Sequence, residues 1–163
     1  MRTVYHGAIE QVSAPLVHVG RDNLDFGKGF YVTDIRSQAK TWALIKARYM
    51  MDGRAFINEY LFDFDNAIIE YNYKKFEHYD SDWLHFIIDS REGLKVWKKY
   101  DIIEGGVAND RVIDTVEGFK AGLISEEMAL NELSKHRPNN QICILRQAVV
   151  EKFLKFQKSI ITE

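Results

Sequence analysis

Apolar and polar positions alternate with two different periods along the chain, and this mixture predicts an α+β fold. Short runs rich in β-branched and aromatic residues predict strands over residues 3–6, 30–32, 55–62, 67–71, 100–104 and 141–145. Between the first two strands, residues 8–25 carry Pro15, Gly20 and Asn23 and predict an irregular loop. The strands do not alternate one for one with helices, which argues against a doubly wound parallel sheet.

One helix is predicted directly after the second strand. Thr33 or Asp34 can cap it, and Gly53 ends it. Its apolar positions recur at helical spacing at Ile35, Ala39, Trp42, Ala43 and Tyr49. This spacing predicts that Trp42 faces inward.

Further helices are predicted in the second half of the chain. Asp80 or Ser81 begins one that runs to residue 91, and Asn109 or Asp110 begins another that runs to residue 120. Ser125 caps a third, which ends near residue 136 before Pro138. From residue 148 onward, the pattern predicts a short helix and then a strand near 156–161, or a helix throughout.

Composition and charge narrow the class of protein. The 163 residues are 46% hydrophobic and 28% charged, which predicts one domain over residues 1–163. The 22 basic and 24 acidic residues do not create the strongly positive field of a dedicated nucleic-acid-binding module. Cys143 is the single cysteine, and no run has the length of a membrane span, so we expect a cytoplasmic protein without a disulfide or a membrane anchor. The start of the chain is typical of a strand and not of an export leader.

A glycine–lysine–glycine segment precedes the second strand. Gly27 and Gly29 let backbone N–H groups approach an anion closely, and Lys28 between them adds positive charge. Tyr31 follows and can present its ring to a flat heterocycle. The segment therefore predicts a cradle for a phosphorylated ligand.

Several familiar chemistries lack their sequence motifs. The chain has no Walker-type Gly-x4-Gly-Lys-Ser/Thr and no Gly-x-Gly-x-x-Gly after a strand, so a kinase or a Rossmann enzyme is not expected. The five histidines show no His-x-x-x-His spacing, and Cys143 has no cysteine beside it, so we expect no metal site.

Three motifs occur in one order along nearly the whole chain: Tyr5-His6-Gly7, then Phe26-Gly27-Lys28-Gly29-Phe30-Tyr31, then Asn140-Gln141. In these motifs the chain resembles the ADP-ribosyltransferase superfamily, in its branch of diphtheria toxin and poly(ADP-ribose) polymerases with a His-Tyr-Glu triad. It resembles more narrowly an uncharacterised bacterial family of unknown function. The resemblance implies an α+β fold in which split antiparallel β-sheets surround a cleft and helices flank them. It also implies NAD as the substrate.

The resemblance implies a role for each matching residue. The triad positions are His6, Tyr31 and Gln141, with His6 on the adenosine ribose and Tyr31 stacked with Trp42 on the nicotinamide. The backbone of Gly7 would bond the nicotinamide amide, and Lys28 and Arg21 would neutralise the pyrophosphate. The expected NAD-binding set is His6, Gly7, Lys28, Gly29, Tyr31, Ser37, Trp42 and Arg21.

Gln141 departs from the family pattern, because the polymerases have glutamate at this position. A carboxamide keeps a hydrogen bond to the ribose but cannot act as a general base, so chain elongation is not expected. Transfer of a single ADP-ribose, hydrolysis and binding without turnover remain open. The carboxylates considered as a helper are Glu77, Asp89 and Glu104.

The sequence therefore predicts a mono-ADP-ribosyltransferase that modifies a protein or nucleic-acid acceptor. It would act as an intracellular toxin, restrained by a neutralising antitoxin protein. Asn139, two residues before Gln141, is the position expected to influence the choice of acceptor. Two alternatives stay open: a module of the same fold that binds NAD or ADP-ribose without catalysis, and a plain structural domain.

Overall fold

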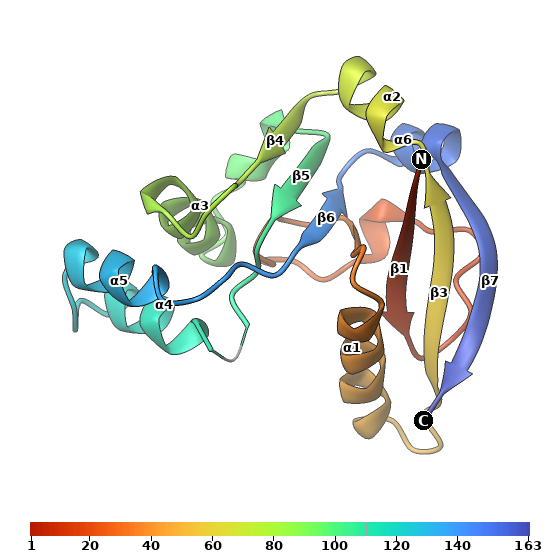
Figure 1. Cartoon of the computed structure of the whole chain (residues 1–163), viewed down its shortest axis with the longest axis horizontal. Helices are drawn as coiled ribbons and strands as arrows, with labels where there is room; N and C mark the ends of the chain where they lie inside the picture. Colours follow the sequence, from red (N-terminus) through yellow and green to blue (C-terminus); the bar gives the residue numbers. More distant parts are fainter. Residues whose placement is uncertain (110) are drawn as a thin grey trace.

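The computed structural model describes residues 1–109 and 111–163, and within them it is an α+β structure with two open sheets (Figure 1). The first sheet is antiparallel and has the order β1-β3-β7. The second has the order β2-β6-β5-β4. The strands are β1 (Arg2–Ala8), β2 (Phe30–Val32), β3 (Ala55–Phe62), β4 (Tyr73–Lys75), β5 (Ile102–Gly105), β6 (Gln141–Ile144) and β7 (Leu154–Thr162).

The second sheet is mixed, which corrects the expectation of two antiparallel sheets. β2, β6 and β5 pair antiparallel, but β4 pairs parallel with β5, with Tyr73 opposite Ile102. The chain between β4 and β5 makes a crossover through a helix and a 3₁₀ turn, η2 (Val96–Lys99). A crossover of this kind returns the chain in the same direction and so produces a parallel pair.

Six helices lie within the described residues, and they surround the two sheets (Figure 1). The longest, α1, packs on β1 and β3, while α3, α4 and α5 form a group beside the second sheet. None of the helices in the described part of the chain has the length and apolar character needed to cross a membrane. The helices are α1 (Arg36–Arg48), α2 (Phe64–Glu70), α3 (Ser81–Arg91), α4 (Ile113–Lys120), α5 (Glu126–Leu133) and α6 (Gln147–Phe153).

The second sheet is the middle layer of the molecule because both of its faces are buried. All four residues of β6 are buried, and successive side chains point to opposite faces. Ile142 and Ile144 join a core that includes Val4 and Phe62 of the first sheet. Cys143 joins a second core that contains residues of α3, α4 and α5. Each core therefore uses alternate residues of the same short strand.

The helix starts confirm two of the expected caps. The Asp80 side chain accepts a hydrogen bond from Trp83 N at 3.0 Å, and Ser125 Oγ accepts one from Met128 N at 3.2 Å. Both bonds satisfy an N–H group that has no partner inside the helix. α5 ends at Leu133, three residues before the expected end, and residues 134–136 continue as a turn.

The expected caps of the other two helices are wrong. α1 begins at Arg36, and its N-cap Ile35 forms no side-chain cap bond. Thr33 Oγ accepts from Ile35 N at 3.1 Å and donates to Asn140 O at 2.7 Å, so this hydroxyl links two segments of the fold. α4 begins after Val112 instead of Asn109. The other proposed cap for α4, Asp110, lies outside the described residues.

The inward face of α1 is narrower than its apolar spacing indicates. Ala39 and Ala43 are buried, and Trp42 is half-buried. Ile35 and Tyr49 are exposed, so their inward placement is wrong. The helix packs through small side chains, which lets it lie close to β1.

The strand expected over residues 67–71 is also wrong. Residues 64–70 form α2, in which Phe64 and Ala67 are buried and Ile69 is 80% exposed. This spacing of buried positions is that of a helix, although the run Ala67-Ile68-Ile69 is typical of a strand. The tail follows the first of its two expected forms, with α6 and then β7.

We predict that Gly7→Ala destabilises the fold, because a Cβ at Gly7 would collide with the backbone of α1. It would meet Ala39 O and would lie 2.8 Å from Ala43 N. We expect a loss of about 1–3 kcal/mol in the free energy of unfolding, measured in urea. Gly118→Ala is the control, because its Cβ would meet only the Ile124 side chain at 3.7 Å or more. Because Gly118 lies in a helix, its replacement by alanine should leave the free energy of unfolding unchanged or raise it. Equal effects of the two variants would contradict the packing argument.

Candidate functional site

A cavity of about 900 Å³ opens where the two sheets separate. Its walls come from β1, the loop that follows β1, β2, α1 and the start of β6. The residues singled out from the sequence that line it are His6, Arg21, Gly29, Tyr31, Trp42 and Gln141. The three triad positions, which are far apart in the chain, therefore surround one space.

The cavity exists because the hydrogen-bond ladder between β1 and β2 stops after one residue pair. Tyr5 and Thr33 exchange two backbone bonds, of 2.7 and 2.9 Å. In an antiparallel ladder the next such pair would be Gly7 and Tyr31. Instead, Tyr31 O accepts from His6 Nδ1 at 2.7 Å, and Gly7 O accepts from Lys46 Nζ at 2.7 Å. Two side chains thus take the place of the missing backbone partners.

His6 is held in a single tautomer by its bond to Tyr31 O. A carbonyl oxygen only accepts, so Nδ1 carries the proton and Nε2 is an acceptor. Burial, and then the positive charge of Lys46, lower the pKa of His6 to about 4. At neutral pH the ring is therefore uncharged, and its Nε2 can accept a hydrogen bond from a hydroxyl group.

Tyr31 presents its ring to the cavity, while its hydroxyl group is bound elsewhere. The hydroxyl donates to Gly27 O and accepts from Phe26 N at 3.2 Å. Burial raises the pKa of Tyr31 well above its ordinary value, so the group stays protonated. The phenol thus fixes the glycine segment and leaves a ring face for stacking, with the half-buried Trp42 as another ring in the lining.

Gln141 is the first residue of β6 and is 4% exposed. Its backbone pairs with Gly105 of β5, and its side chain lines the cavity. Among the described residues, none forms a hydrogen bond with its carboxamide. The carboxamide faces the cavity, where its donor and acceptor groups can bind a ligand.

Two cations of the cavity have no acidic partner. Within the described chain, no carboxylate lies within 4 Å of Arg21 or Lys46. Partial burial, and then repulsion from Arg21, lower the pKa of Lys46. Arg91 differs, because its guanidinium pairs with Asp25. Arg21 and Lys46 are therefore the positive groups available to an anionic ligand.

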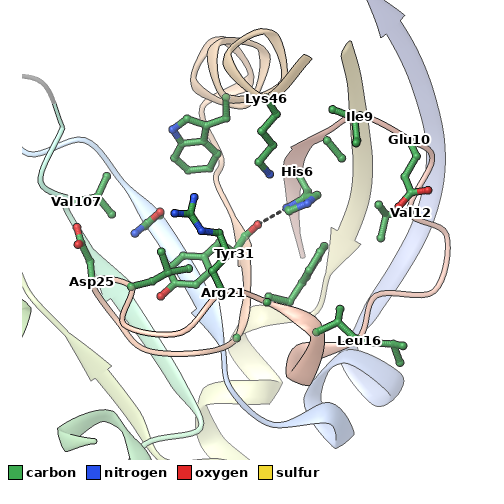
Figure 2. A pocket seen from close by; sticks show the side chains of 18 of the residues that line it. His6, Ile9, Glu10, Val12, Leu16, Arg21, Asp25, Tyr31, Lys46 and Val107 are labelled. Atoms are coloured by element: carbon green, nitrogen blue, oxygen red, sulfur yellow. Dashed lines mark hydrogen bonds between the residues drawn. The ribbon is translucent and has the colours of Figure 1, made fainter. Parts of the chain in front are cut away.

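The opposite end of the cavity carries several apolar side chains together with the carboxylate of Glu10. Figure 2 shows Ile9, Val12 and Leu16 together at this end, away from Asp25 and Val107, with Lys46 extending from α1 toward His6. The buried Asn58 of β3 fixes this loop, because its Oδ1 accepts from Val12 N at 2.9 Å and its Nδ2 donates to Glu10 O at 3.1 Å. The Tyr60 hydroxyl donates to Val12 O as well.

Three residues of the expected NAD-binding set are not part of the cavity lining. Lys28 pairs with Asp22, with 3.5 Å between Nζ and Oδ1, and Ser37 is exposed on α1. Gly7 lies beside the cavity and packs against α1. Of the two glycines around Lys28, Gly29 lines the cavity, whereas Gly27 has a positive φ of 90° and packs against Trp97.

None of the three carboxylates considered as helpers lines the cavity. Glu104 is buried and binds Arg2 Nη1 at 3.2 Å, whereas Glu77 pairs with Lys75. Asp89 lies on α3 outside the lining.

The carboxylates that do line the cavity, Glu10 and Asp25, were missed by sequence reasoning, as were the cations Lys46 and Arg91. The position of Asp25 at the start of the glycine segment could have identified it. Lys46 lies one turn after Trp42 on the same helix, and this spacing could have identified it. Among the described residues, no three His, Cys, Asp or Glu side chains are grouped so as to hold a metal ion.

We predict that His6 makes the stability of the protein sensitive to acid. The pKa of His6 is about 4 in the folded state, against an ordinary value of 6.5. Between these values the unfolded chain binds more protons, so the free energy of unfolding falls as the pH decreases from 6.5 to 4. His6→Asn can keep the donor to Tyr31 O and removes the titration.

At pH 4.5 the variant should lose less stability relative to pH 7 than the wild type, by about 1–2 kcal/mol in urea unfolding. His78→Asn, at an exposed site, is the control and should follow the wild type. A parallel pH profile for His6→Asn and the wild type would contradict the assignment of a buried neutral imidazole.

Comparison with known proteins gives one family. Residues 2–156 match the family described as "Protein of unknown function (DUF3990)". Neither the curated proteins nor the solved structures gave a match to the chain. Because the match covers nearly the whole chain, the protein belongs to this family.

Proposed function

We propose that the protein is an NAD-dependent mono-ADP-ribosyltransferase, which transfers ADP-ribose to a macromolecular acceptor and releases nicotinamide. The observation that carries the proposal is the convergence of His6, Tyr31 and Gln141 on one cavity, in the order of the His-Tyr-Glu pattern that the sequence resembles. The volume of about 900 Å³ lies in the range of cofactor pockets.

The nicotinamide end of NAD would lie near Tyr31 and Trp42. Stacking on rings contributes about 0.5–1.5 kcal/mol beyond the burial of area. In a strand, the backbone groups of residues two positions apart point to the same edge. Tyr5 bonds to Thr33 of the other sheet. The N–H of Gly7 therefore points in the same direction, toward the gap between the two sheets. This N–H can donate to the carbonyl oxygen of the nicotinamide amide, as the resemblance implies.

The remainder of NAD fits the other groups of the cavity. The Nε2 atom of His6 accepts from a hydroxyl of the adenosine ribose, and Arg21 and Lys46 neutralise the pyrophosphate. The apolar side chains of Ile9 and Val12 accommodate the adenine ring. Gln141 then donates to a hydroxyl group of the nicotinamide ribose.

The reaction breaks the bond between C1 of this ribose and the nicotinamide nitrogen, and the electron pair leaves with nicotinamide, which becomes neutral. The acceptor forms a new bond to C1 with its own lone pair and loses one proton. NAD⁺ and the protonated acceptor thus give the ADP-ribosylated acceptor, nicotinamide and H⁺. The carboxamide of Gln141 orients the ribose as positive charge develops on it, but it removes no proton.

We propose further that the activity is toxic inside a cell and is restrained by a partner protein. Expression of the active protein should then inhibit growth, and Gln141→Ala should relieve the inhibition. A second candidate function, binding of NAD or ADP-ribose without turnover, is favoured by the same glutamine, because it provides no base. Equal growth with the wild type and with Gln141→Ala would favour this second function.

We predict that the purified protein releases nicotinamide from NAD in the presence of cell lysate and that Gln141→Ala lowers this rate by about 100-fold or more. The reason is the loss of a preorganised hydrogen bond to the reacting sugar. Gln157→Ala, at an exposed position on β7, is the matched control and should keep the wild-type rate. Nicotinamide release is measured by liquid chromatography.

Thermal unfolding with NAD separates catalysis from binding. At a concentration about 100-fold above its dissociation constant, NAD should stabilise the fold by about 2.7 kcal/mol. Stabilisation without nicotinamide release would identify the binding module. The absence of both effects would refute an NAD site.

A further inference from the structure

A second cavity of about 740 Å³ lies next to the candidate NAD site. Three segments contribute to the lining of both cavities. Tyr31, Val107 and Gln141 line the first cavity, and Asp34, Asn109 and Asn140, each within three residues of one of them in the chain, line the second. The two cavities therefore share a wall.

The shared wall is held by hydrogen bonds at its polar residues. Asn140 O accepts from Thr33 Oγ at 2.7 Å, and Asn139 Oδ1 accepts from Val107 N at 2.8 Å. Gln141 comes directly after Asn140 at the start of an extended strand, where successive side chains point to opposite sides. The two residues that precede Gln141, Asn140 and Asn139, therefore line the second cavity, whereas Gln141 lines the first.

Among the described residues, most of the charged side chains that line the second cavity are basic. Arg111, Lys135 and Arg137 line it, against one described carboxylate, that of Asp34. Lys135 has a partner, because its Nζ lies 2.6 Å from Glu132 Oε1. Within the described residues, no carboxylate lies within 4 Å of Arg111 or Arg137, and both side chains are exposed. These two arginines, which have no carboxylate partner among the described residues, can bind phosphate groups in bidentate fashion.

The polar groups of this cavity also suit a nucleic acid. Asn109, Asn139 and Asn140 contribute to its lining, and each uses one amide atom in a hydrogen bond within the fold. The other amide atom of each can donate to or accept from a base edge. Cations bind the phosphate backbone, and this combination of charge and amides is typical of nucleic-acid contacts.

We propose that the second cavity binds the phosphodiester backbone of a single-stranded nucleic acid and that this nucleic acid is the acceptor of ADP-ribose. The proposal rests on the transferase activity proposed above. Gln141 cannot remove a proton, so the acceptor must attack with a lone pair that is already available. An unprotonated ring nitrogen of a base has such a lone pair. Its bond to C1 of the ribose forms as nicotinamide leaves with the electron pair of the old bond, and any proton of the modified base passes to water.

Binding is tested first, without NAD, by the fluorescence anisotropy of labelled single-stranded DNA and RNA 20-mers at low and at moderate salt. The test variant is the double substitution Arg111→Ala/Arg137→Ala, and the matched control is Arg48→Ala/Arg54→Ala. The control removes the same charge from exposed positions in and after the end of α1. For a single strand, each phosphate contact changes the slope of log affinity against log salt by about 0.7, so loss of two contacts should weaken binding at least about tenfold at 0.1 M salt and flatten the slope.

The control variant should bind like the wild type. Absence of binding by the wild type, or equal loss in both double variants, would overturn the proposal. Circular dichroism spectra of both variants show whether they remain folded.

Transfer is tested second, with labelled NAD, the wild-type protein and either the oligonucleotides or a nuclease-treated lysate. Label on the oligonucleotide, reduced in Arg111→Ala/Arg137→Ala, supports the proposal. The proposal is overturned if protein in the nuclease-treated lysate is labelled and nicotinamide is released, but no oligonucleotide is labelled. This outcome would still support the transferase activity. Oligonucleotide binding through these arginines without any nicotinamide release supports the binding site and refutes the transferase activity.

Discussion

The candidate site depends on the point at which β1 and β2 stop pairing. One residue pair, Tyr5 and Thr33, joins the two sheets, and beyond it the strands diverge. A continued ladder would pair Gly7 with Tyr31 and would close the space that the cavity occupies. Separation of paired strands leaves polar backbone groups that must find other partners, because burial without a hydrogen bond is unfavourable. His6 and Lys46 satisfy two of these groups, so the residues that keep the sheets apart also line the cavity.

Hydrogen bonds from side chains to backbone groups also fix the cavity wall that lies opposite His6, Tyr31 and Gln141. The loop after β1 has little regular structure, yet side chains from the sheet and from α6 hold it. Asn58 binds two backbone groups of the loop, and Gln147 binds Val17 N at 3.0 Å and Pro15 O at 3.1 Å. These hydrogen bonds from side-chain amides give the loop one conformation. A preformed cavity loses less conformational entropy on binding than a flexible one.

Much of the fold could be predicted because local signals agreed with the final structure. Residues 55–62 alternate and are rich in β-branched and aromatic types, and they form β3 with the expected bounds. The helix starts after Asp80 and Ser125 follow from their side chains alone. The strand predicted over residues 67–71 is wrong because a short run of apolar residues fits a strand and a helix turn equally well, and only tertiary packing decides between them.

The sequence identifies a residue of the site only where the residue type itself indicates a role. His6, Tyr31 and Gln141 are recognisable in the sequence, and they line one cavity. The contribution of Lys46 depends on its distance from Gly7 O, which the sequence does not contain. Lys28 is the converse case: its place between two glycines indicated a ligand contact, but the backbone of this segment directs it toward Asp22.

The burial of position 141 gives a physical reason for an amide there. This side chain is 4% exposed, and a carboxylate there would lose most of its hydration. An ionised group is much more costly to bury than an amide unless an opposite charge lies close to it. The nicotinamide ring of NAD is positively charged, so NAD would supply that charge only while it is bound. Under the proposed function, glutamine would keep the hydrogen bond to the sugar without burying a charge, at the expense of the base that an acceptor with a bound proton would require. Under the proposed function, a site of this kind would favour acceptors that are nucleophilic in their neutral state.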